Sequence, residues 1–370
     1  MGDNEKTVYI LGAGFSRAFS EMTGMEPKFP VMDDFMKLVE NHNFWLHGFP
    51  NEEKDILIFW INEHYKSNFG INIEELMTIF ELMKEGYIES LNANEIEGQR
   101  NLADKLIHSL KNYIRLRLAL NLNESDFSKA EILIKWLINM RKNKKIISFN
   151  LDILIETAIG YAKDSKDLVQ NTWNFLSKNV YTKDEMWSPF FDRSNYNDFN
   201  VIPLRFIKLH GSIDWLCCSN DKCFEHFRIY HDIYYYNNCI YGHGNFPTPA
   251  IYCPMCGSPM EFVILPPQMV KEIDRYPRLK VLWRLAAHSL KLCDRIVVIG
   301  YSFPLNDTRT TYLMMRSLEG RANVVNWTIV DIDPEKIQKR LIEILPKHEN
   351  NILDAERCYS LMDYLEKHFS

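Results

Sequence analysis

The sequence predicts an α/β protein built on an open, mostly parallel sheet, with a large helical insert and a small cysteine-rich module. Short apolar runs rich in β-branched residues recur along the chain, and most of them end in a glycine, an amide or an ionisable residue. Helical periodicity fills roughly a hundred residues between the first two runs. Two closely spaced cysteine pairs follow the third run. Together these three patterns set the expected architecture.

The expected strands are buried runs that alternate, in the second half of the chain, with helices. The strands are Thr7–Gly12, Lys145–Asn150, Arg205–His210, Phe262–Pro266, Asp294–Gly300 and Trp327–Asp331. The alternating helices are Tyr276–Leu292, Asn306–Leu318 and Pro334–Leu345. Such alternation is typical of parallel sheets, whose ligands lie beyond the carboxyl ends of the strands. We therefore expect the residues at those ends to converge on one site.

The chain divides into three expected parts. A Rossmann-like domain is assembled from segments 1–30, 143–215 and 263–370. The helical insert occupies 31–142, where Leu76, Ile79, Phe80 and Met83 repeat at helical spacing. Residues 216–262 form the cysteine-rich module.

Composition and charge exclude several classes of protein. The 370 residues are 46% hydrophobic and 25% charged, which is ordinary for a folded protein, and the net charge is −6. A negative chain has no global field to attract a nucleic-acid backbone, so we expect no direct nucleic-acid binding. Acidic residues stand where a signal peptide needs a basic region, and no apolar run could cross a bilayer. We expect a cytoplasmic protein without a membrane anchor.

A glycine-rich turn follows the first expected strand. Gly12, Ala13, Gly14 and Ser16 form a turn in which backbone N–H groups can approach a pyrophosphate at a helix N-terminus. Arg17 stands where the dinucleotide-binding fingerprint has its third glycine. A tight structural turn is therefore the alternative interpretation.

Polar residues that suit catalysis end the next two strands. Asn150 and Asp152 follow the second strand, and His210 ends the third. Taken singly, the first two are typical of a helix cap and the third of a buried histidine. Together they bring an amide, a carboxylate and a base that titrates near neutral pH to neighbouring strand ends. Such a set can hold a ribose and move a proton.

Two later turns supply further candidate contacts. Gly300, Ser302 and Asp307 form a second glycine turn before a helix, which suits ribose or phosphate. Asp331 ends the following strand and is the candidate for an adenosine ribose, whereas Asp333 is expected to cap the helix that begins at the next proline.

The cysteine pairs have the spacing of a tetrahedral zinc site. They are Cys218 with Cys223 and Cys253 with Cys256, about thirty residues apart. Four thiolates leave no open coordination position, so the zinc is expected to be structural and the module zinc-ribbon-like. Unrelated free thiols are the alternative. Other candidate ligands are Cys217, which could replace Cys218, and Cys239, His231 and His243.

In this order, GAGFS, FNLD, HGS, the cysteine pairs, GYS and the strand that ends in Asp331 resemble the sirtuin superfamily. That family combines an NAD-binding Rossmann-type domain with a small zinc module. The resemblance implies that the GAGFS turn lies on the pyrophosphate and nearby ribose of NAD. It also implies that Asn150 and His210 are the catalytic-pocket asparagine and the catalytic histidine, and that Asp152 lies near the nicotinamide amide.

The chain differs from the protein-deacylating sirtuins in two segments. Residues 17–29 replace the GIPDFR-type segment, and residues 262–268 read FVILPPQ where those enzymes line an acyl-lysine channel. The forms FNLDxLIE, KLHGSIDW and GYSFPLND resemble the divergent sirtuin-like branch, whose members act as NAD-cleaving effectors in bacterial anti-phage defence. The resemblance thus implies an NAD+ hydrolase that releases nicotinamide and ADP-ribose.

Two alternatives stay open. One is an NAD-dependent protein deacylase or ADP-ribosyltransferase, which needs an acyl-lysine tunnel or an acceptor groove. The other is a non-catalytic sensor of NAD or ADP-ribose, although a sensor needs neither the asparagine nor the histidine. Unregulated NAD+ hydrolysis is toxic, so the resemblance also implies control through a homo-oligomer or a separate regulatory protein such as an ATPase.

Overall fold

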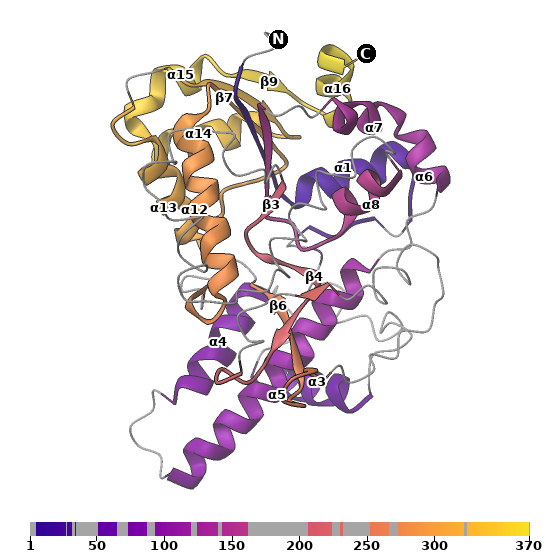
Figure 1. Ribbon diagram of the computed structural model, residues 1–370, viewed down its shortest axis with the longest axis vertical. Coiled ribbons are helices and arrows are strands. Elements are labelled where there is room, and N and C mark those ends of the chain that lie inside the picture. Colours follow the sequence, from indigo (N-terminus) through magenta and orange to yellow (C-terminus); the bar gives the residue numbers. More distant parts are fainter. Residues whose placement is uncertain are drawn as a thin grey trace.

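The computed structural model places a twisted sheet and its covering helices above a smaller lobe of helices and short strands (Figure 1). The residues that it describes are 5–26, 28–31, 34, 51–64, 73–86, 93–119, 124–139, 143–161, 206–223, 230–231, 252–265, 273–321 and 324–369.

Among the described residues, the main sheet has six parallel strands in the order β3-β2-β1-β7-β8-β9. Their bounds are β1 Thr7–Leu11, β2 Lys144–Ser148, β3 Phe206–Lys208, β7 Arg295–Ile299, β8 Asn326–Val330 and β9 Glu356–Cys358. The last residue of β1 pairs with Ser148 on one side and Ile299 on the other, so the carboxyl ends of the central strands lie level. The predicted parallel sheet is confirmed.

Each face of the sheet is covered by helices. Val8 and Ile10 of β1 pack toward α12, α13 and α14, whereas Tyr9 and Leu11 pack toward α1, α7, α8 and α16. Figure 1 shows these two groups on opposite sides of the strands. The bounds are α1 Ala13–Thr23, α7 Glu131–Ile138, α8 Leu154–Tyr161, α12 Pro277–Leu292, α13 Thr308–Leu318, α14 Pro334–Ile344 and α16 Leu361–Phe369. Short elements complete this half: η4 Ile273–Arg275, η5 Pro346–His348 and α15 Glu349–Leu353.

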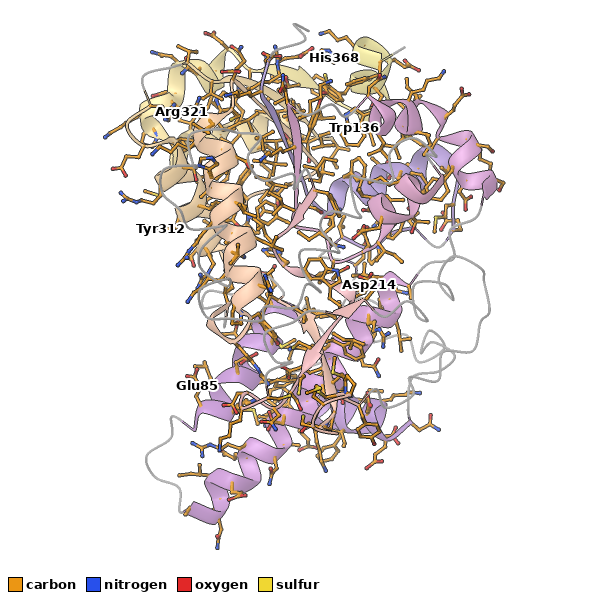
Figure 2. The ribbon with its side chains drawn as sticks, in the orientation of Figure 1. Glu85, Trp136, Asp214, Tyr312, Arg321 and His368 are labelled. Atoms are coloured by element: carbon orange, nitrogen blue, oxygen red, sulfur yellow. The ribbon has the colours of Figure 1, made fainter. Side chains whose placement is uncertain are left out.

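The helical segment between β1 and β2 is divided between the two lobes. Helices α3 (Asn51–His64), α4 (Ile73–Glu85) and α5 (Ala93–Leu118) form the lower lobe (Figure 1). By contrast α6 (Glu124–Lys129) and α7 lie beside the main sheet, where the Trp136 ring meets the edge of Tyr9 at 5.3 Å (Figure 2). The part of the expected insert that follows α5 thus belongs to the crossover that covers β1. None of the described helices is long and apolar enough to span a bilayer.

A second, antiparallel sheet has the order β5-β4-β6. Its strands are β4 Gly211–Cys218, β5 Tyr230–His231 and β6 Met260–Ile264. The expected strand at Phe262 therefore pairs with β4 instead of joining the parallel sheet. Gly211 makes the departure from β3 possible: its φ is +83°, and a Cβ there would lie 1.9 Å from the carbonyl oxygen of Val263.

Candidate functional site

Two glycine turns interlock at the carboxyl edge of the main sheet. Gly12 N–H donates to Ile299 O at 3.1 Å, and Gly14 N–H donates to Gly300 O at 2.9 Å. A Cβ on Gly14 would lie 2.7 Å from Gly300 Cα. The glycines thus let the β1–α1 and β7–α13 turns touch. The backbone N–H groups of Gly12 and Gly14 are both used in hydrogen bonds across this contact. Ala13 between them is exposed at the N-terminal end of α1.

Three predicted site residues from two turns meet directly. Ser16 Oγ donates to Asp152 Oδ2 at 2.8 Å and accepts from Asn150 Nδ2 at 3.0 Å. All three side chains are buried. The serine is the link between them, because one hydroxyl satisfies the amide on one side and the carboxylate on the other. The sequence names all three residues, but not this contact.

The Asn150 side chain is held in one orientation with its oxygen unused. Its Nδ2 is bound to Ser16, while Oδ1 has no hydrogen-bond partner among the described residues. A buried acceptor without a donor costs about 1–3 kcal/mol. A ligand hydroxyl or a bound water that donates to Oδ1 would remove that cost.

Asp152 is a buried carboxylate beside this amide. Burial raises its pKa, and the Lys208 ammonium opposes that effect. Its Oδ1 accepts from Leu154 N–H at 3.0 Å, as expected for the start of α8. The same aspartate therefore accepts the first N–H of α8 and holds Ser16.

His210 lies in a second buried pair. Its Nε2 is 3.1 Å from Asp307 Oδ2, and both side chains are at most 2% exposed. The ring packs against the Phe149 edge at 5.1 Å and is stacked near Trp283 at 6.3 Å. The structure thus brings the predicted histidine together with an aspartate that the sequence had assigned to ribose or phosphate.

The other predicted site residues lie apart from these two clusters. Arg17 forms an ion pair with Asp34. Ser302 is exposed in the turn after β7. Asp331 accepts from the Asp333 N–H at 3.0 Å, and burial raises its pKa. Arg17 lies in α1, whereas Ser302 and Asp331 lie in the turns that follow β7 and β8.

A buried lysine that sequence reasoning missed supports the loop that carries Asn150 and Asp152. Lys208 Nζ donates to Asp152 O at 2.6 Å, to Glu156 Oε1 at 2.8 Å and to Ser212 Oγ at 2.7 Å. Burial raises the pKa of Glu156 to about 7 against the attraction of Lys208, and the Asp214 charge on β4 adds to the rise (Figure 2). The sequence does hint at this buried ion pair, because charged residues stand inside the otherwise apolar segments KLHGSIDW and FNLDxLIE.

Removing the lysine should cost stability in a pH-dependent way. We expect Lys208→Met to lower the free energy of unfolding by roughly 3–5 kcal/mol near pH 8, because Glu156 loses its cation in a buried site. Glu156 binds its proton more tightly when folded than when unfolded. Its contribution to stability is therefore full below the unfolded pKa and is lost as pH rises through about 7. The deficit should shrink at about pH 5.5 in urea titrations.

Two further variants test that explanation. Lys208→Met combined with Glu156→Gln should recover part of the loss, since position 156 then carries no buried charge that needs the Lys208 cation. Lys367→Met is the matched surface control, because Lys367 pairs with Glu356 while its side chain is 61% exposed. Its cost should stay under about 1 kcal/mol. An equal loss in all three variants at both pH values would contradict a buried ion pair.

Four cysteines gather at the tip of the second sheet. The Sγ atoms of Cys218, Cys223, Cys253 and Cys256 all lie within 4.8 Å of one another. The Cys218–Cys256 and Cys223–Cys253 sulfurs are 3.6 and 3.8 Å apart. Four thiolates at about 2.3 Å from a tetrahedral zinc lie roughly 3.8 Å from each other, so this donor set fits the metal.

The backbone around Cys253 has the form of a metal knuckle. Cys253 O accepts from Gly257 N–H at 2.9 Å, and Cys253 N–H donates to Ser258 O at 2.8 Å. Gly257 takes a φ of +69° that closes the turn. Cys217 points elsewhere, with its Sγ 3.6 Å from Glu261 Oε1, so Cys218 is the member of the cluster. The side chains of the other candidates, Cys239, His231 and His243, lie outside the described residues.

No protein-family model matches the chain, and no curated protein matches it significantly. Solved structures of low similarity align along most of its length. A complex of a Sir2 homolog with NAD is 14% identical, with 99% of this chain and 90% of that chain covered and a TM-score of 0.42. A Sir2 homologue triple mutant with 2'-O-acetyl ADP-ribose is 13% identical, with 99% and 92% covered and a TM-score of 0.38.

Proposed function

We propose that this chain is a sirtuin-like NAD+ hydrolase that cleaves the nicotinamide–ribose bond and releases nicotinamide and ADP-ribose. The observation that carries the proposal is the unsatisfied Oδ1 of Asn150, fixed by Ser16 next to the Asp152 carboxylate. The order of the GAGFS, FNLD, HGS and GYS motifs supports NAD as the ligand, because each motif lies at the carboxyl edge of the sheet or in the turn beside it.

The chemistry asks little acid assistance of the protein. The nicotinamide ring already carries a positive charge while it is bound to the ribose, so it is a good leaving group. The active site therefore has to stabilise an oxocarbenium-like ribose and to admit water. Asn150 Oδ1 accepts a hydrogen bond from a ribose hydroxyl or from the attacking water. Because Ser16 fixes the amide, the oxygen needs no reorganisation when the substrate arrives.

Asp152 and His210 supply the remaining functions in this proposal. The Asp152 carboxylate has lone pairs beyond those used by Ser16 and Leu154. These can accept a hydrogen bond from the carboxamide N–H of nicotinamide and so align the nicotinamide–ribose bond. His210 acts as the base on a ribose hydroxyl or on the water. Its nearly complete burial keeps bulk solvent away, which strengthens these interactions.

The proposal is tested by incubating the purified chain with NAD+, with and without an acetylated-lysine peptide, and separating the products by chromatography. Nicotinamide and ADP-ribose formed without peptide support the hydrolase. Cyclic ADP-ribose would identify cyclisation in place of hydrolysis. Products that require the peptide would favour a deacylase. Binding of NAD+ without any product would favour a sensor.

We expect His210→Ala to lower kcat by about 10²–10⁴-fold, with the affinity for NAD+ much less affected, because a base acts on the chemical step. The measurement is single-turnover cleavage alongside NAD+ binding by calorimetry. His368→Ala is the control: that histidine lies on α16 at the far end of the sheet and pairs with Glu356 (Figure 2). An unchanged rate constant in His210→Ala would rule out base catalysis by this ring.

We also propose the biological setting that the resemblance implies. The chain would act in the cytoplasm as an NAD-depleting effector of anti-phage defence, restrained until a trigger acts through a homo-oligomer or a separate protein such as an ATPase. Activity that appears only at high protein concentration would support self-assembly as the control. Loss of cellular NAD+ during phage infection, abolished by Asn150→Ala, would support the defensive role.

A further inference from the structure

Asp307 receives more hydrogen bonds than a helix cap requires. It begins α13, where its Oδ1 accepts Thr310 N–H at 3.2 Å. Its Oδ2 also accepts Thr310 Oγ1 and Tyr301 OH, each at 2.7 Å, and lies 3.1 Å from His210 Nε2. Asp333 shows what capping alone needs: at the equivalent start of α14 it accepts Lys336 N–H, and it is exposed.

The turn that carries Asp307 is held in a defined shape. Gly300 has a φ of +61°, and Phe303 has a φ of +50°, which a side chain as large as phenylalanine rarely adopts. Such a conformation persists only where its surroundings enforce it. Phe303 is buried, and its carbonyl accepts Arg340 Nε at 3.0 Å.

Tyr301 fixes the carboxylate from the other side. Its ring lies flat on Phe149 with centroids 4.3 Å apart, and Phe149 in turn touches His210. Burial, reinforced by the Asp307 charge, raises the pKa of Tyr301 well above its ordinary value, so the phenol stays a donor. Tyr301 and Thr310 thus aim Oδ2 at the histidine ring.

We propose that Asp307 is a positioning residue for His210: its carboxylate fixes the ring plane and keeps the proton on Nε2. This inference rests on the proposed function for its catalytic meaning, while the positioning itself is a property of the protein alone. A carboxylate can only accept, so the nitrogen that faces it must donate. In the neutral ring Nδ1 then carries the lone pair and is the basic atom of the ring. The proposal replaces the ribose contact that the sequence suggested for Asp307.

The test is Asp307→Asn, with Asp333→Asn as the matched control. Asparagine caps helices about as well as aspartate, so both variants should keep their fold. At position 307, however, the new amide can donate as well as accept, and it no longer enforces one tautomer. We expect kcat for NAD+ cleavage to fall about 100-fold with KM and NAD+ affinity unchanged, while Asp333→Asn matches the unchanged protein.

A second readout does not depend on activity. In protein labelled with 15N-histidine, the ring signals of His210, assigned by their loss in His210→Gln, should show the proton on Nε2. Asp307→Asn should shift the population toward the Nδ1–H form, and Asp333→Asn should not. An unchanged tautomer in Asp307→Asn would overturn the proposal, as would an NAD+ affinity that falls in step with the rate. The latter would restore the ribose contact. If the unchanged protein cleaves no NAD+, the proposed function fails. The tautomer of the His210 ring, which is measured without substrate, then still decides whether Asp307 positions that ring.

Discussion

We expect Asn150→Ala to lower NAD+ turnover by about 10²–10³-fold while leaving the fold and the metal content unchanged. The size follows from the role: the amide oxygen is the group that orients the attacking water or the ribose hydroxyls, and removal of one such preorganised group costs about 10²–10³ in rate. Stability should change little. The variant loses the Nδ2 contact with Ser16, but it also loses a buried oxygen that has no partner among the described residues, and the two effects are each about 1 kcal/mol.

The measurement combines nicotinamide release with thermal unfolding of the same preparations. Asn326→Ala is the control, because that asparagine is exposed at the start of β8, at the opposite end of the sheet from the site. It should behave like the unchanged protein in both assays. Retained turnover in Asn150→Ala would remove the asparagine from the mechanism. A loss of activity that accompanied a lower melting temperature would assign it a structural role.

The main sheet could be predicted because its central strands are strong local signals. Runs such as KIIS and RIVVI are β-branched, buried and close to turns, so their state hardly depends on the rest of the chain. β9 could not be predicted in this way: Glu356–Cys358 has three residues, and only pairing with β8 makes it a strand. The start of β4 was hidden too, because KLHGSIDW shows no break in composition where Gly211 turns the chain.

The candidate site was predictable in its residues and not in its contacts. Asn150, Asp152 and His210 stand at strand ends, which is a property of local sequence. Their partners come from elsewhere: Ser16 lies 136 residues before Asp152, and the His210–Asp307 pair joins β3 to the turn before α13. Only the sheet order brings these turns together. Lys208 escaped notice for a different reason, since a lysine inside a strand is usually an edge or surface residue.

The second large effect is expected at the metal cluster. We expect Cys253→Ser to lower the free energy of unfolding by more than about 4 kcal/mol or to prevent folding, because the binding free energy of a structural zinc, about 10–16 kcal/mol, contributes directly to folding. Among the described residues, the apolar packing immediately around the cluster consists of the cysteines themselves and Met260, so the metal ties together the end of β4 and the turn before β6 where little else packs. The assays are metal content per chain and urea unfolding.

Cys217→Ser is the matched control, because it removes a buried thiol next to Cys218 whose sulfur lies outside the cluster and contacts Glu261. It should cost about 1 kcal/mol and keep the metal, since serine can still donate to the carboxylate. A chelator should then weaken the unchanged protein and Cys217→Ser alike, and should leave Cys253→Ser unaffected. A soluble, metal-free Cys253→Ser protein of unchanged stability and activity would show that the four thiols need no metal. In that case the spacing of the cysteines would reflect packing alone.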